Sequence, residues 1–272
     1  MTGPVWPSVG WAAFWAAACC LAWAVAGLAL ARLARRNNIV DTLWGLGFCL
    51  IAAVVAAAAA QLGSGDPLRR ALLLVCVLAW GLRLAWHVGR RSAGKGEDPR
   101  YADLLEKGRG SPGWRAVALI FAPQAVTLFV VSLPVQAGMV EHGPVGWLGW
   151  AGVAVWLTGF AFESVGDAQM RRFKADPGNQ GKIADTGLWS YTRHPNYFGD
   201  ATVWTGIFLI AAERWPGVLT IIGPALMTYL LAFGTGKRLL EQSMRSRPGY
   251  PEYMRRTSGF VPLPRRLARL VH

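Results

Sequence analysis

The chain has 272 residues, of which 53% are hydrophobic, only 16% are charged and 14 are Trp. About a quarter of the residues of an ordinary soluble domain are charged, so this composition excludes that class and indicates an integral membrane protein. The formal net charge of +13 must then be explained by where the basic residues lie along the chain.

Apolar runs define the expected membrane spans, because a helix needs ~20 apolar residues to cross a bilayer. They predict an all-α, polytopic membrane helical bundle of about seven transmembrane helices. The spans are expected at Val9–Ala31, Ile39–Ala60, Ala71–Val88, Ala116–Met139, Val145–Val165, Tyr197–Ala212 and Pro216–Phe233. The first run lacks the basic start and the cleavage site of a signal peptide, so we expect it to be retained. We expect a single integral membrane domain over 1–272, with a transmembrane core at about 9–233 and a cytosolic C-terminal segment at about 237–272.

Orientation follows from Lys and Arg, which are enriched in cytoplasmic loops. If the N-terminus is outside, most of the 28 basic residues fall on inner loops. We therefore expect the N-terminus outside, the C-terminus cytosolic and an active site that faces the cytoplasm. This distribution, together with anionic lipid headgroups, explains the net charge. Because the basic residues are spread over several loops at one membrane face, we expect membrane lipids as partners and no nucleic acid.

Four cysteines lie inside apolar runs and show neither metal-site spacing nor a disulfide framework. They are Cys19, Cys20, Cys49 and Cys76. We expect them to be small buried hydrophobic residues, and we expect no metal site.

Ionisable residues within spans cost ~2.5–3.5 kcal/mol each on insertion scales, so they are candidate functional residues. The segment "NNIVDTLWGLGF" places Asp41 at the inner end of the second span, and "WGLRLAWHVGRR" places Arg83 and His87 four residues apart on one helical face. Two structural alternatives stay open here. Asp41 would serve equally well as a helix N-cap, and Arg83 as a residue that snorkels or pairs with a carboxylate.

Two further segments gather polar side chains at the inner face. The segment "FESVGDAQMRRFK" carries Glu163, Asp167, Arg171 and Lys174 on one helical face. The segment "GLWSYTRHPNYFGD" carries Arg193, His194, Asn196, Tyr197 and Asp200. The first could be a solvated face laced by i, i+4 pairs, and the second a loop-to-helix junction with Pro195 in the first turn and Tyr197 as an interfacial aromatic. So many hydrogen-bonding groups in one place favour a binding site.

These residue types suit a nucleotide. Arg171, Arg172, Lys174 and Arg193 can bind phosphates. Asp167 and Asp200 can accept hydrogen bonds from ribose hydroxyls, and the Asn196 amide suits a carboxamide or a base edge. No GxGxxG or P-loop follows a strand, so a Rossmann or Walker-type site is not expected.

The run "TGLWSYTRHPNYFGD" resembles the signature of the steroid 5-alpha-reductase superfamily, in particular of its bacterial branch. "NNIVDTLWGLGF", "WGLRLAWHVGRRSAGKGEDPRY" and "GYPEYMRRTSGFVPLP" resemble that branch in the same order, so the resemblance covers nearly the whole chain. It implies a seven-helix bundle of the bacterial inner membrane whose cytosolic half encloses NADPH. It also implies hydride transfer to an activated C=C of a lipid or steroid-like substrate, and we expect a monomer.

Several residues are assigned to the cofactor by this resemblance. Asp167, Asn196 and Asp200 match positions that hold NADPH, and Lys174 and Arg83 match basic positions. Glu163 stands where the steroid enzymes have Asn. The third span contains no Tyr to polarise a substrate carbonyl, and Trp80 falls near that place, so Asp41 and His87 are the candidates for polarising or protonating the substrate.

Two other functions stay open. Methyltransferases of the isoprenylcysteine and phospholipid type, which use S-adenosylmethionine, share a looser "RHPxYxG" element but usually carry a Glu pair in the last helix, where this chain has Glu241 alone. A nonenzymatic membrane scaffold or transporter would favour polar residues near mid-bilayer and inverted repeats, and neither is evident.

Overall fold

The structure, a computed structural model, describes residues 5–234 and 236–264. Its regular elements there are all helical, and the β pairing among these residues is an isolated bridge between Thr192 and Ser258. The chain packs as two compact units, each discontinuous in sequence. The first unit contains the residues up to Trp150 together with Ile207–Gly223, and the second contains Ala151–Gly206 and the chain from Pro224 onward. The expectation of a single domain stays a prediction.

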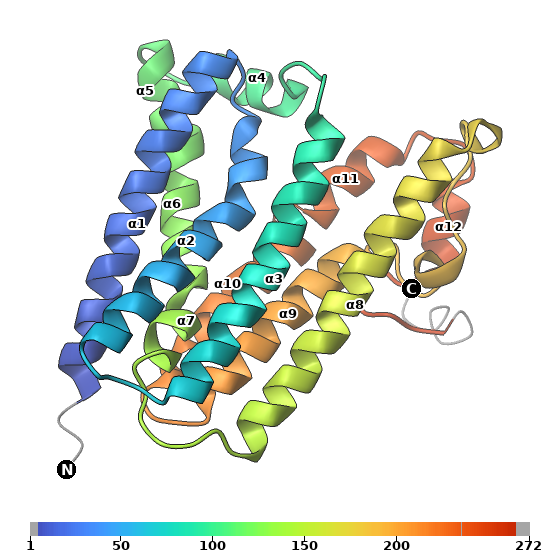
Figure 1. Cartoon of the computed structure of the whole chain (residues 1–272). Helices are drawn as coiled ribbons and strands as arrows, with labels where there is room; N and C mark the ends of the chain where they lie inside the picture. Colours follow the sequence, from blue (N-terminus) through green and yellow to red (C-terminus); the bar gives the residue numbers. More distant parts are fainter. Residues whose placement is uncertain (1–4, 235, 265–272) are drawn as a thin grey trace. The chain divides into compact units, whose positions relative to one another are not determined.

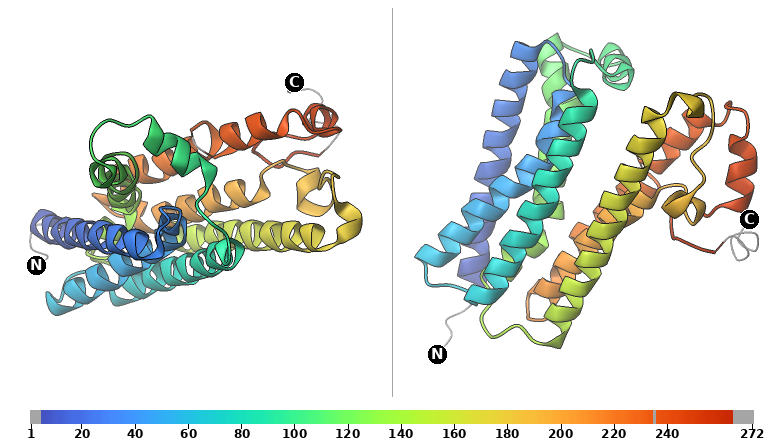
Figure 2. Two further views of the ribbon diagram at one scale, coloured as in Figure 1. Left: turned by 90° about the horizontal axis from the view of Figure 1, so that it is seen from above. Right: turned by 45° about the vertical axis from the view of Figure 1, so that its right-hand side comes forward.

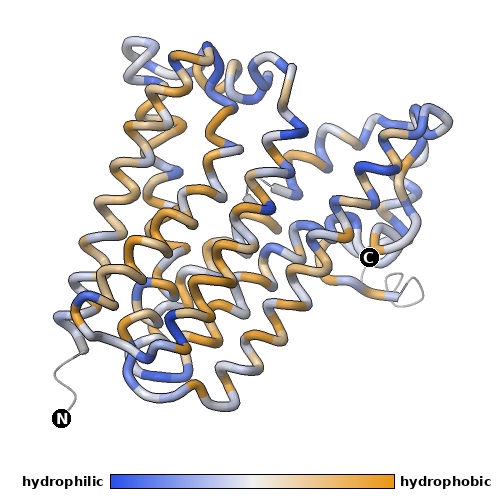
Figure 3. Tube along the Cα trace, viewed as in Figure 1, coloured by the Kyte–Doolittle hydropathy of each residue, from blue (hydrophilic) through white to orange (hydrophobic). Residues whose placement is uncertain are grey.

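The first unit is built on long helices that lie side by side, as Figures 1 and 2 show for α1 to α3. Its elements are α1 (Val5–Ala34), α2 (Ile39–Gln61), α3 (Pro67–Ser92), α4 (Pro99–Glu106), α5 (Pro112–Ala116), η1 (Val117–Phe121), α6 (Ala122–Val131), α7 (Leu133–Gly138) and η4 (Gly217–Ile221). Figure 3 shows hydrophobic residues along α1 and α2 and hydrophilic residues in the loop that carries α4.

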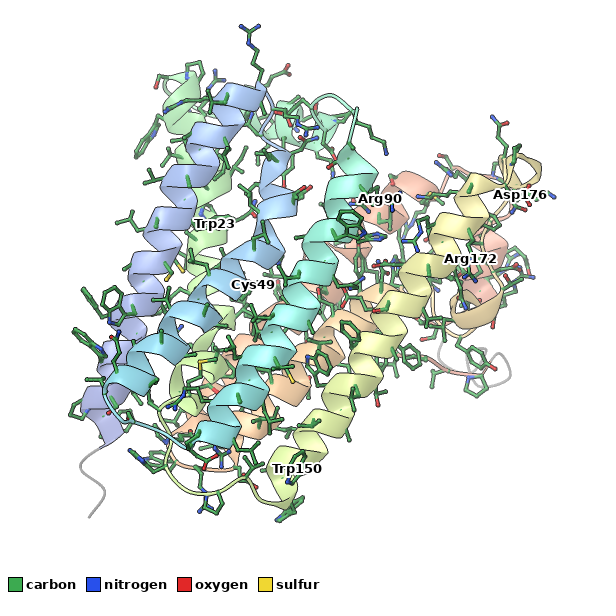
Figure 4. All side chains as sticks on the ribbon, in the orientation of Figure 1. Trp23, Cys49, Arg90, Trp150, Arg172 and Asp176 are labelled. Atoms are coloured by element: carbon green, nitrogen blue, oxygen red, sulfur yellow. The ribbon has the colours of Figure 1, made fainter. Side chains whose placement is uncertain are left out.

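The second unit contains most of α8 (Trp147–Ala175) and the first two-thirds of α9 (Pro195–Ala212). Short elements complete it, namely η2 (Pro177–Asn179), η3 (Gly187–Ser190), α11 (Lys237–Met244) and α12 (Tyr250–Arg256), and α10 (Ile222–Ala232) begins at its boundary. Arg172 and Asp176 mark the C-terminal end of α8 in Figure 4.

Six helical segments of the described chain are long and apolar enough to cross a membrane by length and composition. They are Trp6–Ala34, Ile39–Gln61, Pro67–Ser92, Pro112–Val131, Trp147–Ala175 and Gly217–Met244. They confirm the predicted polytopic helical bundle and indicate an integral membrane protein. The predicted span Tyr197–Ala212 does form a helix, α9, but it is not one of the six, and Asn196 and Asp200 make its first turns polar.

The predicted fourth span, Ala116–Met139, is divided in the structure. The apolar segment ends at Val131, and a separate short helix, α7, follows with Pro134 in its first turn. The segment also begins with a π-helical turn at Val117–Phe121, just before Pro123. Since proline has no N–H and its ring needs space in the preceding turn, both departures from a regular helix lie where a proline disfavours one.

Glycines bring α2 and α3 into close contact within the first unit. A Cβ on Gly45 would lie 2.4 Å from Gly81 O, and a Cβ on Gly81 would lie 2.6 Å from Gly45 O. Trp23, labelled in Figure 4, donates from Nε1 to Leu43 O at 2.8 Å and ties α1 to α2. The four cysteines are free and buried, which confirms their prediction as small core residues.

The start of α3 carries a fully buried cation, Arg69. Its Nη1 donates to Ile210 O at 2.5 Å, and its Nη2 donates to Glu213 Oε2 at 3.0 Å. A second carboxyl group, Glu141, is also buried nearby, and its Oε1 would lie 2.4 Å from a Cβ on Gly217. Burial raises the pKa of Glu141 to about 8, against the opposing charge of Arg69. The charge of Arg69 thus acts on both Glu213 and Glu141, but among the described residues Arg69 forms an ion pair only with Glu213.

Candidate functional site

The candidate residues fall into two groups, one in each unit. Asp41, Arg83 and His87 belong to the first unit, and the other candidates belong to the second.

Asp41 has a partner that sequence reasoning did not identify. The Tyr101 hydroxyl of α4 donates to Asp41 Oδ1 at 2.6 Å. The N-cap of α2 is Asn38, so Asp41 lies inside the first turn and the N-cap alternative for this residue is wrong. Burial and the Asp41 charge both raise the pKa of Tyr101, so its hydroxyl stays protonated and remains a donor.

A second acidic residue, Glu97, fixes the start of α2. Its carboxylate accepts the backbone N–H of Asn37 at 2.5 Å and that of Asn38 at 2.9 Å. It also accepts from the Asn37 side-chain amide at 2.9 Å. A remote glutamate therefore supplies the anion that a helix N-terminus favours, and it holds the turn that carries Asp41.

Arg83 and His87 lie on a different side of α3 from the α2 contact. Close approach to α2 involves Gly81 and Ala85, because a Cβ on Gly45 would meet the carbonyl of the first and the backbone N of the second. Residues two positions further along a helix are rotated by about 200°, so Arg83 and His87 point away from α2. The two residues thus share one helical face, as predicted, and that face is turned away from the close contact with α2.

Glycines also join α8 to α9 in the second unit. A Cβ on Gly199 would lie 2.5 Å from the backbone N of Glu163 and 2.7 Å from its Cβ. A Cβ on Gly166 would lie 3.4 Å from the backbone N of Asn196. Each glycine directly precedes an aspartate, Asp167 on α8 and Asp200 on α9, so the contact gathers the predicted acidic residues along one helix pair.

Three carboxylates of this pair are buried, namely Glu163, Asp167 and Asp200. The alternative of a solvated helix face is therefore wrong for Glu163 and Asp167. It holds for Arg171 and Lys174, which lie one and two turns further along and are exposed. Buried carboxylates are costly unless other groups compensate them. This part of α8 is therefore more than a helix end that leads from the membrane into solvent.

Asn196 differs from Arg193 and His194 in the hydrogen bonding of its side chain. Its side chain is half-buried and makes no hydrogen bond to another described residue. An amide offers two donors and an acceptor. Asn196 therefore brings free hydrogen-bonding capacity to the buried acidic helix pair.

Three hydrogen bonds hold the Arg193 guanidinium inside the protein. Its Nε donates to Glu241 Oε1 at 2.8 Å, and its Nη1 donates to Met254 O at 2.9 Å and to Thr257 O at 2.5 Å. Sequence reasoning listed Arg193 among the phosphate-binding residues and did not identify Glu241 as its partner. The structure shows that most of this guanidinium binds α11, α12 and the residue that follows α12.

His194 shares the same carboxylate. Its Nε2 lies 3.1 Å from Glu241 Oε1, and its ring stacks on Tyr197 with centroids 5.2 Å apart. Burial lowers the pKa of His194, although Glu241 opposes this. A neutral ring that bonds a carboxylate through Nε2 carries its proton there, so Nδ1 is a bare acceptor.

The junction that was predicted as an alternative is also present, because α9 begins at Pro195. Upstream of it, Trp189 Nε1 donates to Gly166 O at 3.1 Å, and the Tyr253 hydroxyl donates to Trp189 O at 2.6 Å. These bonds connect α12 to α8 next to Asp167. The run from Trp189 to Asp200 is therefore both a structural junction and the carrier of the candidate residues.

Comparison with known families decides where the chain belongs. The sequence pattern of a family described as a protein of unknown function, DUF1295, matches residues 27–257. The chain belongs to this family. The matched DUF1295 region contains every candidate residue named above, together with Tyr101 and Glu241. No curated protein and no solved structure matches the chain.

Proposed function

We propose that this DUF1295 protein is an NADPH-dependent membrane reductase that transfers a hydride to an activated C=C of a lipid or steroid-like enone. The observation that supports it most directly is Asn196, an uncommitted half-buried amide beside three buried carboxylates. The resemblance of "RHPNYFGD" and the flanking runs to the steroid 5-alpha-reductase superfamily favours the same function.

The residues of the second unit fit a dinucleotide. Carboxylates such as Asp167 and Asp200 accept hydrogen bonds from ribose hydroxyls, and the Asn196 amide matches a carboxamide, which has the complementary donor and acceptor. Exposed Arg171 and Lys174 lie further along α8, where they suit phosphates. NADPH, when bound, supplies the hydride.

The residues of the first unit act on the substrate. Reduction of an enone places negative charge on the carbonyl oxygen, and a positioned donor there is worth about 2.7–4 kcal/mol. We assign this role to Asp41 in its protonated form: the Tyr101 hydroxyl donates to Oδ1 and holds the carboxyl group in place, and Oδ2 carries the proton that is donated to the substrate oxygen. His87 is the second candidate for the proton donor.

Cofactor titration tests the proposal. Protein purified in mild detergent is heated with NADPH, NADH or S-adenosylmethionine, and the melting temperature is recorded. We expect NADPH to raise it and Asn196→Ala to weaken NADPH binding about tenfold, which corresponds to about 1.4 kcal/mol and to one lost hydrogen bond. Asn179→Ala, in the turn after α8, is the matched control and should leave binding unchanged.

The same titration decides against the proposal if S-adenosylmethionine alone stabilises the protein. That result would favour the methyltransferase alternative. The internal bonds of Glu241 to Arg193 and His194 speak against this alternative, because they engage the chain's only glutamate in that helix.

A further inference from the structure

One nitrogen of the Arg193 guanidinium makes no hydrogen bond within the described part of the chain. Nε and Nη1 are bound to Glu241 and to the carbonyls of Met254 and Thr257, whereas Nη2 makes no hydrogen bond to a described residue. The side chain is buried, with 4% of its surface exposed. The bound atoms therefore fix the guanidinium plane, and Nη2 is held in one direction.

That direction leads to Gly259. A Cβ on Gly259 would lie 3.1 Å from Arg193 Nη2 and 2.9 Å from Lys237 Nζ. Two cationic nitrogens thus converge on a position where the chain has no side chain. None of the ion pairs between described residues involves Lys237.

The local charges do not balance. Arg193 and Lys237 each carry a positive charge, and the nearby anion, Glu241, is bound by Arg193 and His194 through one oxygen. Lys237 and Arg193 both act as positive charges on His194. Like charges a few ångströms apart repel, so an anion that contacts both nitrogens would relieve this repulsion.

We propose that Arg193 Nη2 and Lys237 Nζ, converging beside Gly259, form a subsite for a phosphate oxyanion. An arginine and a lysine are complementary here, because the fixed guanidinium sets direction and the flexible ammonium follows the ligand. The phosphate belongs either to the dinucleotide or to a lipid headgroup. Only the first source rests on the proposed function.

Filling the subsite tests it without removing a charge. Gly259→Ala adds a methyl group where the two nitrogens converge. The closer neighbour, Lys237 Nζ at 2.9 Å, is the end of a flexible side chain that can move, and the Arg193 Nη2 contact at 3.1 Å needs a shift of a few tenths of an ångström, so the fold should tolerate the methyl group. Lys237→Gln removes one cation. Arg238→Gln, on the exposed side of α11, is the matched control. Elution as one species in detergent checks that each variant is folded.

The first probe is inorganic pyrophosphate, measured by calorimetric titration. We expect wild-type protein to bind it, both subsite variants to bind about tenfold more weakly, as charge-assisted contacts predict, and Arg238→Gln to bind like wild type. Equal affinity in wild type, Gly259→Ala and Lys237→Gln would overturn the subsite, as would an equal loss in all three variants.

Two further probes identify the source of the phosphate. NADP⁺ and NAD⁺ are compared with a short-chain phosphatidylglycerol in the same variants. Weaker NADP⁺ binding in Gly259→Ala assigns the subsite to the dinucleotide, and weaker phosphatidylglycerol binding with no dinucleotide binding at all assigns it to a lipid while removing the proposed reductase. Weaker phosphatidylglycerol binding beside unchanged dinucleotide binding assigns the subsite to a lipid and leaves the reductase in place. If no subsite variant changes the binding of either ligand, the subsite is removed.

Discussion

Arg69 and Glu141 are buried ionisable residues of the first unit, and burial of a charge is costly unless a partner compensates it. Arg69 is fully buried and bonds to Glu213 and to backbone carbonyls, which compensates its charge. Glu141 is nearly as deeply buried, and Arg69 lies near it without forming an ion pair with it. Burial without a direct counter-ion favours the neutral acid.

This difference predicts a pH dependence of stability. The pKa of Glu141 is about 8 in the folded protein and 4.5 ordinarily, so the folded state binds the extra proton. Its contribution to stability is complete below pH 4.5 and is lost as pH rises through 8. We expect wild-type melting temperature to fall over that range and Glu141→Gln to fall less, with about 2–4 °C for each kcal/mol. Parallel curves for the two proteins would contradict this.

A substitution at Tyr101 can test its hydrogen bond to Asp41 separately from the packing of its ring. Tyr101→Phe removes the hydroxyl that holds Asp41. We expect kcat to fall about tenfold, the value of roughly one positioned hydrogen bond, while KM and NADPH binding change little. The assay follows NADPH oxidation with a panel of lipid enones. Tyr191→Phe, at an exposed tyrosine, is the control, and an unchanged kcat in Tyr101→Phe would return this residue to a structural role.

At the scale of elements, the contact between α8 and α9 organises the second unit. Three glycines, Gly159, Gly199 and Gly206, leave only 2.5 Å between an added Cβ and the facing backbone. Such contacts let two helices approach more closely than larger side chains would. The acidic residues therefore reach their positions because of the glycines beside them.

A methyl group in this contact should push the helices apart. We expect Gly199→Ala to lower stability by about 1–3 kcal/mol, the usual cost of overpacking, and to weaken NADPH binding as well. Gly10→Ala is the matched control, because a Cβ there meets nothing within 4 Å and alanine favours a helix. Melting curves and NADPH titration measure both effects. Equal behaviour of the two variants would show that the close contact is not required.

At the scale of the whole molecule, six apolar segments indicate membrane insertion, and the distribution of Lys and Arg predicts its direction. With the N-terminus outside, the end of α2 faces outward and the loop after α3 faces the cytoplasm. These two positions are occupied by exposed Gln61 and Lys95.

Thiol labelling in intact cells tests this orientation. Gln61→Cys should react with a membrane-impermeant maleimide from outside, whereas Lys95→Cys should react only after permeabilisation. The parent protein is a suitable background because its four cysteines are buried. The reverse pattern of labelling would invert the topology and place the candidate residues on the outer side.

Local properties of the sequence determined the helices and the membrane class. Apolar runs and Pro or Gly at their ends act over a few residues, so most spans, the start of α9 at Pro195 and the burial of the cysteines were predictable. The candidate polar segments were predictable for the same reason, since ionisable residues near a membrane are rare.

Tertiary structure alone decided the partners of those residues. Asp41 and Tyr101 are 60 positions apart, and Arg193 and Glu241 are 48 apart, so no local pattern links them. Their pairing depends on which helices pack together and on glycines that permit close approach. The nearest polar groups in space, rather than in sequence, compensate a buried charge, and for this reason the structure separated the internally bound Arg193 from the uncommitted Asn196.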